Sequence, residues 1–290
     1  MTREGSVPPS TAPTLRQQRL GTELRKLREH AGLTSSAAAG LLGLKQAQIS
    51  NIEAGRYAVS ADRVRTFASS YSCTDSAFVD ALAAMTGGRQ RGWWDEYREH
   101  LPVTLIDLAE LEHHAAGLRV ALIIHIPGLL QTTDHARALF QQVAPPMRQY
   151  EIEHRLTHRM KRQGILHRDN PPPYAATIHE AALRMGFGGP DIARGQLRHI
   201  IDLSELAHVS IRVIPFGADH FPSTGQSFDY VKGPVPQLDT VQLDTHHGGC
   251  GFLDADAQLS KYRSVLDQME PCALNPAESR DFIHRLIRDT

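Results

Sequence analysis

The sequence predicts a mainly α-helical protein with two domains: an N-terminal five-helix bundle, and an α+β C-terminal domain whose mostly antiparallel sheet is flanked by helices. Apolar residues recur at helical spacing throughout residues 14–85. From about residue 119, segments rich in β-branched residues alternate with helical patterns. The chain has 290 residues, enough for two separate cores. We expect a disordered arm at 1–13, the bundle at 14–88 and the second domain at 89–290.

The first domain is expected to contain five short helices, the first of them within residues 14–31. The second and third helices form a pair joined at Gly43, because glycine readily adopts the left-handed conformation of such a junction. Thr34 and Ser35 can cap the second helix, and Ser60 can cap the fourth, by accepting hydrogen bonds from unpaired backbone N–H groups.

The second domain alternates between helical and strand patterns. Helices are expected after about residue 105 and after Thr132, and then at 147–164, 190–207, 255–269 and 276–289. Strands are expected at 119–126, 174–179, 208–215, 227–233 and 239–245, followed by a glycine-rich loop at 246–251. The late strands should pair antiparallel, because their connections are too short for crossover helices.

Polar side chains cover the third predicted helix, which is the second of the pair joined at Gly43. Lys45, Gln46, Gln48 and Asn51 lie there, as is typical of a helix that recognises DNA in the major groove. Residues 14–71 contain 9 Lys and Arg against 4 Asp and Glu, a net charge of +5, although the whole chain has −1. A solvated face of an ordinary bundle would also explain these side chains, but the glycine-centred turn favours DNA recognition.

This segment resembles the Xre/Cro type of helix-turn-helix, in which Ile49, Ile52, Glu53 and Gly55 match the Ile-x-x-Ile/Leu-Glu-x-Gly ending of the recognition segment. The resemblance implies that Gln46, Ala47 and Asn51 face base edges, that Ser35 and Lys45 touch phosphate, and that Arg28 forms a structural ion pair with Glu53. Ala47 offers only a methyl group, so it weakens any transferred base code. The candidate DNA contacts are Ser35, Lys45, Gln46, Ala47, Gln48, Ser50, Asn51 and Arg56.

Composition favours a globular cytoplasmic protein over an exported or membrane-bound one, and the predicted DNA binding would associate it with the nucleoid. Apolar residues make up 41% of the chain and charged residues 22%. The longest apolar run, Val120–Leu130, is interrupted by His125 and Pro127 and is too short to span a bilayer. The three cysteines are far apart and odd in number, so we expect reduced thiols.

The second domain resembles the C-terminal domain of actinomycete regulators described as antitoxin-like or WhiJ-like. The resemblance is carried by Trp94 and Tyr97, by the Glu110–Ala115 helix, by Ile126–Thr132 with Ala136-Arg137-Ala138 after it, and by Arg155, Arg159, Arg162 and Gln163. One departure is that His154 and His158 interrupt the expected arginine-rich pattern. The resemblance implies a transcription factor with a non-catalytic second domain that works with a small partner protein encoded nearby.

Several patterns suggest enzymes or metal sites only weakly, and we expect no catalytic residue, metal or cofactor. His179-Glu180 begins an H-E-x-x-H zinc pattern, but Leu183 occupies the place of the second histidine. His154 and His158, and His246, His247 and Cys250, form pairs or clusters that 16 histidines produce by chance. A DNA-targeted metallohydrolase therefore remains a distant alternative.

Regulation is expected to act through the second domain. A homodimer would place two recognition helices on a palindromic operator in double-stranded DNA. Trp93, Trp94 and Tyr97 follow the interdomain linker, where aromatic side chains serve as core, as an interdomain contact or as a wall for a ligand. The main alternative is a repressor that senses a small-molecule effector instead of a protein partner.

Overall fold

The computed structural model describes residues 12–86, 92–222, 225–245 and 249–290. Two compact units divide after Arg91. Most of the predicted arm at 1–13 and the predicted boundary at residue 88 lie outside the described residues. In the described part of the chain, no helix combines the length and apolar character needed to cross a bilayer.

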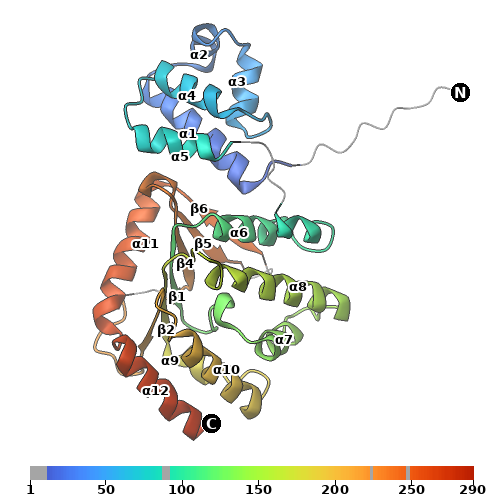
Figure 1. The fold of residues 1–290 in the computed structure, drawn as a ribbon, viewed down its shortest axis with the longest axis vertical. Coiled ribbons are helices and arrows are strands. Elements are labelled where there is room, and N and C mark those ends of the chain that lie inside the picture. Colours follow the sequence, from blue (N-terminus) through green and yellow to red (C-terminus); the bar gives the residue numbers. More distant parts are fainter. Residues whose placement is uncertain (1–11, 87–91, 223–224, 246–248) are drawn as a thin grey trace, which may run out of the picture. The chain divides into compact units, whose positions relative to one another are not determined.

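The first unit contains the five predicted helices: α1 (Leu15–His30), α2 (Ser35–Leu41), α3 (Gln46–Glu53), α4 (Ala61–Ser70) and α5 (Ser76–Ala84) (Figure 1). Thr34 and Ser60 cap α2 and α4 as predicted. Ser35, the other predicted cap, instead occupies the first position of α2. The core between the helices is built from fully buried apolar side chains such as Leu24, Ile49 and Leu82.

The second unit combines a six-stranded sheet with helices. The strands are β1 (Gly117–Leu122), β2 (Tyr174–His179), β3 (Val209–Ile214), β4 (Phe228–Lys232), β5 (Thr240–Asp244) and β6 (Cys250–Leu253). The α-helices are α6 (Val103–His113), α7 (Thr133–Gln141), α8 (Gln149–Arg162), α9 (Glu180–Arg184), α10 (Pro190–Leu203), α11 (Asp256–Met269) and α12 (Pro276–Asp289). Short 3-10 helices include η1 (Trp93–Tyr97), η2 (Gly128–Leu130) and η3 (Gln163–Leu166).

The sheet has the order β3-β2-β1-β4-β5-β6 and is mixed. The β1–β4, β4–β5 and β5–β6 pairs are antiparallel, as the short late connections predicted. The β1–β2 and β2–β3 pairs are parallel, because helices α7 and α8 cross over between β1 and β2, and α9 and α10 between β2 and β3.

Alternating residues place a separate core on each face of the sheet. Leu118 and Val120 of β1 belong to the core that includes residues of α10 and α12. Ala121 of β1 and Tyr230 of β4 belong to the core that α11 closes. Figure 1 shows α11 on one side of the sheet and α6, α8 and α10 on the other.

The structure corrects three predicted boundaries in the second unit. The predicted loop at 246–251 was wrong at its end, because Cys250 opens strand β6, which pairs with β5; residues 246–248 lie outside the described chain. The strand predicted to reach residue 126 ends at Leu122, after which the Ile123 N–H donates to the Ser227 hydroxyl instead of continuing the ladder. The helix predicted to reach residue 207 ends at Leu203.

Candidate nucleic-acid interface

The turn between α2 and α3 has the geometry that the sequence predicted. Gly43 has a φ of +65°, in the left-handed region. The Leu44 N–H donates to the Ala39 carbonyl at 2.8 Å, which closes the end of α2. At the other end of α2, the Thr34 hydroxyl accepts from the Ala37 N–H at 3.1 Å. These contacts set the direction in which α3 leaves the turn.

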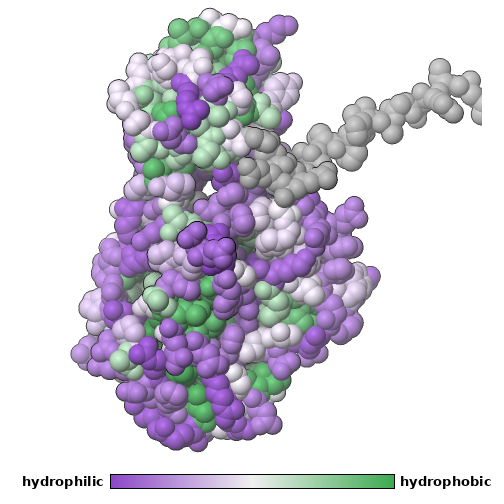
Figure 2. All heavy atoms as spheres, viewed as in Figure 1, coloured by the Kyte–Doolittle hydropathy of each residue, from purple (hydrophilic) through white to green (hydrophobic). Residues whose placement is uncertain are grey.

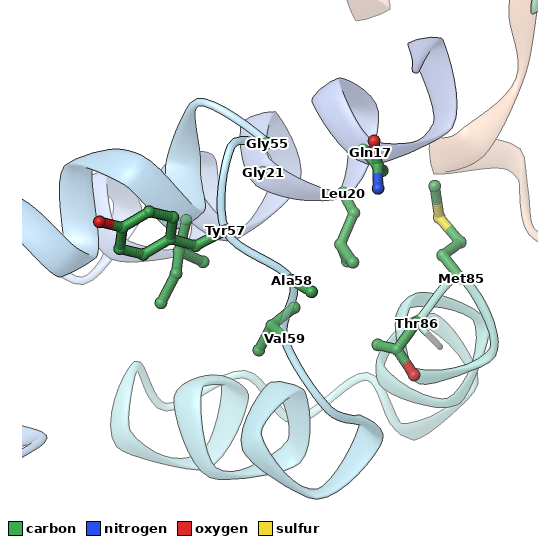
Figure 3. Close-up of a pocket in the computed structure, with 10 residues that line it drawn as sticks. Gln17, Leu20, Gly21, Gly55, Tyr57, Ala58, Val59, Met85 and Thr86 are labelled. Carbon is green, nitrogen blue, oxygen red and sulfur yellow. The ribbon is translucent and has the colours of Figure 1, made fainter. Parts of the chain in front are cut away.

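Two glycines allow α1 to lie directly against the C-terminal end of α3. A Cβ atom on Gly21 of α1 would meet the carbonyl oxygens of Ile52 and Glu53 at 2.6 and 2.5 Å. Gly55 has a φ of +70°, and a Cβ there would meet the Gln17 backbone at 2.9 Å. Figure 3 shows both glycines at the pocket that this packing leaves beside α1. The close backbone approach explains Gly55 in the recognition segment and also identifies Gly21, which the sequence did not.

The ion pair between Arg28 and Glu53 fixes α3 from behind. Arg28 donates from Nε and Nη2 to the two oxygens of Glu53 at 2.6 and 2.9 Å, and both side chains are about nine-tenths buried. Its Nη1 donates to the Leu33 carbonyl at 2.7 Å, just before α2. The hydrogen bond with Glu53 raises the pKa of Arg28. Burial, with a smaller contribution from Glu53, raises the pKa of Tyr71 to about 12.

The opposite side of α3 faces solvent and carries most of the predicted DNA contacts. Asn51 is half-buried, whereas the exposed predicted contacts are Lys45, Gln46, Ala47, Gln48, Ser50 and Arg56. Two amides already have local roles. Gln46 Nε2 donates to the Ser35 hydroxyl at 3.3 Å and so links α3 to α2. Gln48 Oε1 accepts from the Lys45 N–H at 2.9 Å and caps α3.

Ion pairing separates the cations of the first unit into two groups. Several arginines outside the helix pair are neutralised by carboxylates, as in Arg19–Glu23 and Arg25–Glu29, whereas the exposed Arg63 of α4 lies over the Phe67 ring. Among the described residues, Lys45 and Arg56 form no ion pair, and they flank the two ends of α3. Exposed, unpaired cations beside a polar helix can bind the phosphates on either side of a major groove.

Tyr57 is a candidate contact that the sequence analysis did not include. Its side chain is 53% exposed directly after Arg56, and its N–H donates to the Asn51 carbonyl at 3.2 Å. An exposed tyrosine carries both an apolar ring and a hydroxyl that can bind phosphate. In the sequence, this role of Tyr57 is indicated by its position two residues after Gly55 of the Glu-x-Gly ending.

The aromatic residues predicted after the linker lie within the second unit. Trp94 and Tyr97 are buried in a cluster with residues of α6, and Trp93 packs at its edge. The buried His158 ring lies 5.4 Å from the Trp93 ring and 5.2 Å from the Tyr97 ring. Burial lowers the pKa of His158 to about 3. These side chains therefore join η1 to α8 within the unit.

The weak enzyme-like patterns have local structural roles. His179 Nδ1 accepts from the Ala181 N–H at 3.1 Å, so this histidine caps α9. Glu180 accepts from the Phe216 N–H and from Arg184. In the described part of the chain, no three His, Cys, Asp or Glu residues lie together in a way that could hold a metal ion. His246 and His247 are outside the described residues.

The turn at Gly43, the exposed polar α3 and the packing of α1 behind it define a helix-turn-helix DNA-binding protein. Residues 19–82 match the family described as a helix-turn-helix domain. Residues 105–285 match the family described as a domain of unknown function, DUF5753. The chain belongs to the DUF5753 family, because that match covers more than half of its length. No curated protein and no solved structure gave a match.

Proposed function

We propose that the protein is a homodimeric transcriptional regulator that binds an operator through α3 and whose DNA binding is adjusted when a small partner protein docks on the second unit. The observation that carries this proposal is the exposed polar face of α3 with the unpaired Lys45 and Arg56 at its ends. Amides can recognise base edges, and flanking cations hold phosphates. In this proposal the second unit regulates and does not catalyse.

Dimerisation follows from the size of the DNA contact. One short recognition helix reaches too few base pairs to select a promoter in a genome. Two copies related by a two-fold axis would bind a palindromic operator with half-sites one helical turn, or a multiple of a turn, apart. Half-site spacing in the operator therefore tests this part of the proposal.

Exposed apolar side chains support partner docking on the second unit. Ile124 and Phe216 are 48% and 59% exposed and lie two residues beyond the ends of the parallel strands β1 and β3. Met185, 48% exposed, follows α9 after β2. Figure 2 shows hydrophobic areas within a mostly hydrophilic surface. All three follow strands that are parallel and whose carboxyl ends share one edge of the sheet. Exposed apolar side chains on a shared edge favour a protein interaction surface, and the resemblance to WhiJ-like regulators favours the same role.

The DNA-binding test begins with genome-wide mapping of bound sites to define the operator. Fluorescence anisotropy then compares Asn51→Ala and Lys45→Ala with wild type. Asn51→Ala should lose about 1–3 kcal/mol of discrimination between the operator and mutated sites, because it removes a base contact. Lys45→Ala should weaken binding to all sequences. It should also reduce the slope of log affinity against log salt concentration by about 1, the amount expected for one lost phosphate contact.

Arg65→Ala is the matched control, because Arg65 is exposed on α4 and already paired with Asp80. It should leave affinity and discrimination unchanged. Unchanged discrimination in Asn51→Ala would refute the base contact. For the second unit, mapping with and without the neighbouring small gene, together with co-purification of its product, tests partner control. Operator binding that responds to a small molecule in the absence of any partner would instead support the effector-sensing alternative.

A further inference from the structure

Three segments that are far apart in the sequence meet around α8 in the second unit. Arg162 of α8 donates from Nε and Nη2 to the two oxygens of Glu112 on α6 at 2.7 and 2.6 Å, and both side chains are buried. Gln163 Nε2 donates to the carbonyls of Gly128 and Gln131, at 3.2 and 2.6 Å, which attaches the η2 segment to the end of α8. The charge of Arg162 is therefore neutralised within the fold.

Arg159 lies on the same side of α8 but has a different environment. Its Nη1 donates to Gln131 Oε1 at 2.6 Å, and its guanidinium lies 4.5 Å from the centre of the Phe140 ring. Gln131 is itself held by donation from its Nε2 to the Ile126 carbonyl at 2.7 Å. Among the described residues, Arg159 has no carboxylate partner, and its buried Nε has no hydrogen-bond acceptor.

These contacts leave one edge of the Arg159 guanidinium without a hydrogen-bond partner. Gln131 occupies Nη1, so the two parallel N–H groups of Nε and Nη2 remain unpaired; the side chain as a whole is half-buried, and its Nε is closed off from solvent. This edge is the fork with which arginine binds carboxylate or phosphate through two hydrogen bonds. Phe140 and Gln131 hold the guanidinium in place, so little side-chain freedom would be lost on binding.

The sheet topology places this group where open sheets bind ligands. The strand order reverses beside β1, which has β2 on one side and β4 on the other. The segment from Ile126 to Gln131 follows the carboxyl end of β1. In sheets with helical crossovers, ligands bind outside the carboxyl ends of the parallel strands, and β1, β2 and β3 all end at this edge, whereas β4 is antiparallel to β1.

The surrounding charges leave Arg159 positive and incompletely neutralised. Burial, and next the charge of Arg162, lower the pKa of Arg159 to about 10, so it stays protonated at neutral pH. Burial, and next the charge of Asp244, raise the pKa of Asp229 on β4 to about 8, so that carboxyl is mostly neutral. Burial lowers the pKa of His135 to about 4. Two carboxylates, Asp244 at the end of β5 and to a smaller extent Glu112, oppose the lowering of the Arg159 pKa.

We propose that the second unit binds a small organic anion, whose carboxylate or phosphate group pairs with the free Nε–Nη2 edge of Arg159 beside the carboxyl end of β1. This site is separate from the DNA-binding face of α3 and does not depend on it. It would supply the second unit with a ligand whether or not a partner protein also docks.

The test uses the full chain with inorganic phosphate, acetate and citrate as probes. In wild type, a bound probe should slow modification of Arg159 by phenylglyoxal, measured by mass spectrometry of peptides, because the reagent reacts with the terminal guanidinium nitrogens and the anion would cover Nη2. Modification of the exposed Arg198 on α10 serves as the internal control and should not change. Equal modification of Arg159 with and without all three probes would overturn the proposal.

A variant gives the second measurement. Calorimetry should show about tenfold to hundredfold weaker probe binding to Arg159→Gln, because a charged two-point hydrogen bond is lost. Arg198→Gln makes the same change of charge at an exposed position and should bind as wild type does. Probe binding that is unchanged in Arg159→Gln would also overturn the proposal. Operator affinity is measured in parallel, so failure at α3 and failure at Arg159 are distinguished.

Discussion

Two helical glycines of the first unit should respond in opposite directions to the same substitution. In Gly21→Ala, the new Cβ would meet backbone atoms of Ile52 and Glu53 at 2.5–2.8 Å, whereas ordinary contacts begin near 3.4 Å. In Gly40→Ala, on α2, the new Cβ would meet nothing within 4 Å. The neighbours of Gly21 are backbone atoms, which cannot rotate away, so α1 would have to separate from α3.

The sizes of the two stability changes follow from helix propensity and from the cost of overpacking. Alanine is favoured over glycine within a helix by about 1 kcal/mol. At Gly40 this gain is unopposed, so Gly40→Ala should stabilise the first unit by about 0.4–1 kcal/mol. At Gly21, overpacking of a rigid contact costs about 3 kcal/mol, at the upper end of the usual range, so the net loss is about 2 kcal/mol.

Hydrogen exchange with mass spectrometry measures both effects in the full chain, because peptides from α1 and α3 report the first unit alone. A loss of about 2 kcal/mol corresponds to about thirtyfold faster exchange in Gly21→Ala. Gly40→Ala should exchange a few times more slowly than wild type. Wild-type protection in Gly21→Ala would refute the close backbone approach.

Three further predictions concern buried charges. Glu53→Gln leaves Arg28 buried without its carboxylate and should lower the free energy of unfolding of the first unit by about 3 kcal/mol. Hydrogen exchange of α1 measures this loss, and protection equal to that of wild type would contradict it. Arg162→Met leaves the Glu112 charge buried without a partner and should lower the free energy of unfolding of the second unit by about 3–5 kcal/mol. Urea unfolding followed by tryptophan emission measures this loss, because both tryptophans lie in that unit. An unchanged midpoint would argue against a buried ion pair. Burial raises the pKa of Asp229 from 3.8 to about 8, so its neutral form stabilises the second unit below about pH 4, and this stability is lost as the pH rises through about 8. The urea concentration at the unfolding midpoint should therefore decrease as the pH is raised from about 5 to 8 in wild type, and should decrease less in Asp229→Asn. An equal decrease in both proteins would refute the raised pKa of Asp229.

The helix pair that forms the DNA interface could be predicted because its determinants are local. The cap at Thr34 and the left-handed turn at Gly43 act within a few residues of their own positions. The exposed face of α3 follows from helical spacing once Ile49 and Ile52 are buried. The role of Gly21 could not be predicted in this way, because it depends on the distance between α1 and the end of α3.

The sheet was predicted only in part, because pairing joins distant segments. The antiparallel late strands follow from short connections, but β6 has only four residues and includes Gly251, so its alternation is too weak to identify without its partner β5. The parallel pairing of β1, β2 and β3 depends on the helices between them; α7, α8 and α10 were predicted individually without being assigned as crossovers, and the short α9 was not predicted.

The arginines of α8 show most directly why the second unit's chemistry needs tertiary structure. Arg155, Arg159 and Arg162 have spacings of four and three residues, so the sequence places all three on one side of a helix and makes them equivalent. The fold separates two of them: Arg162 meets a buried carboxylate on α6, whereas Arg159 meets the neutral amide of Gln131. A carboxylate neutralises an arginine, but an amide only orients it. The same side chain is therefore structural at one position and free to bind an anion one turn earlier.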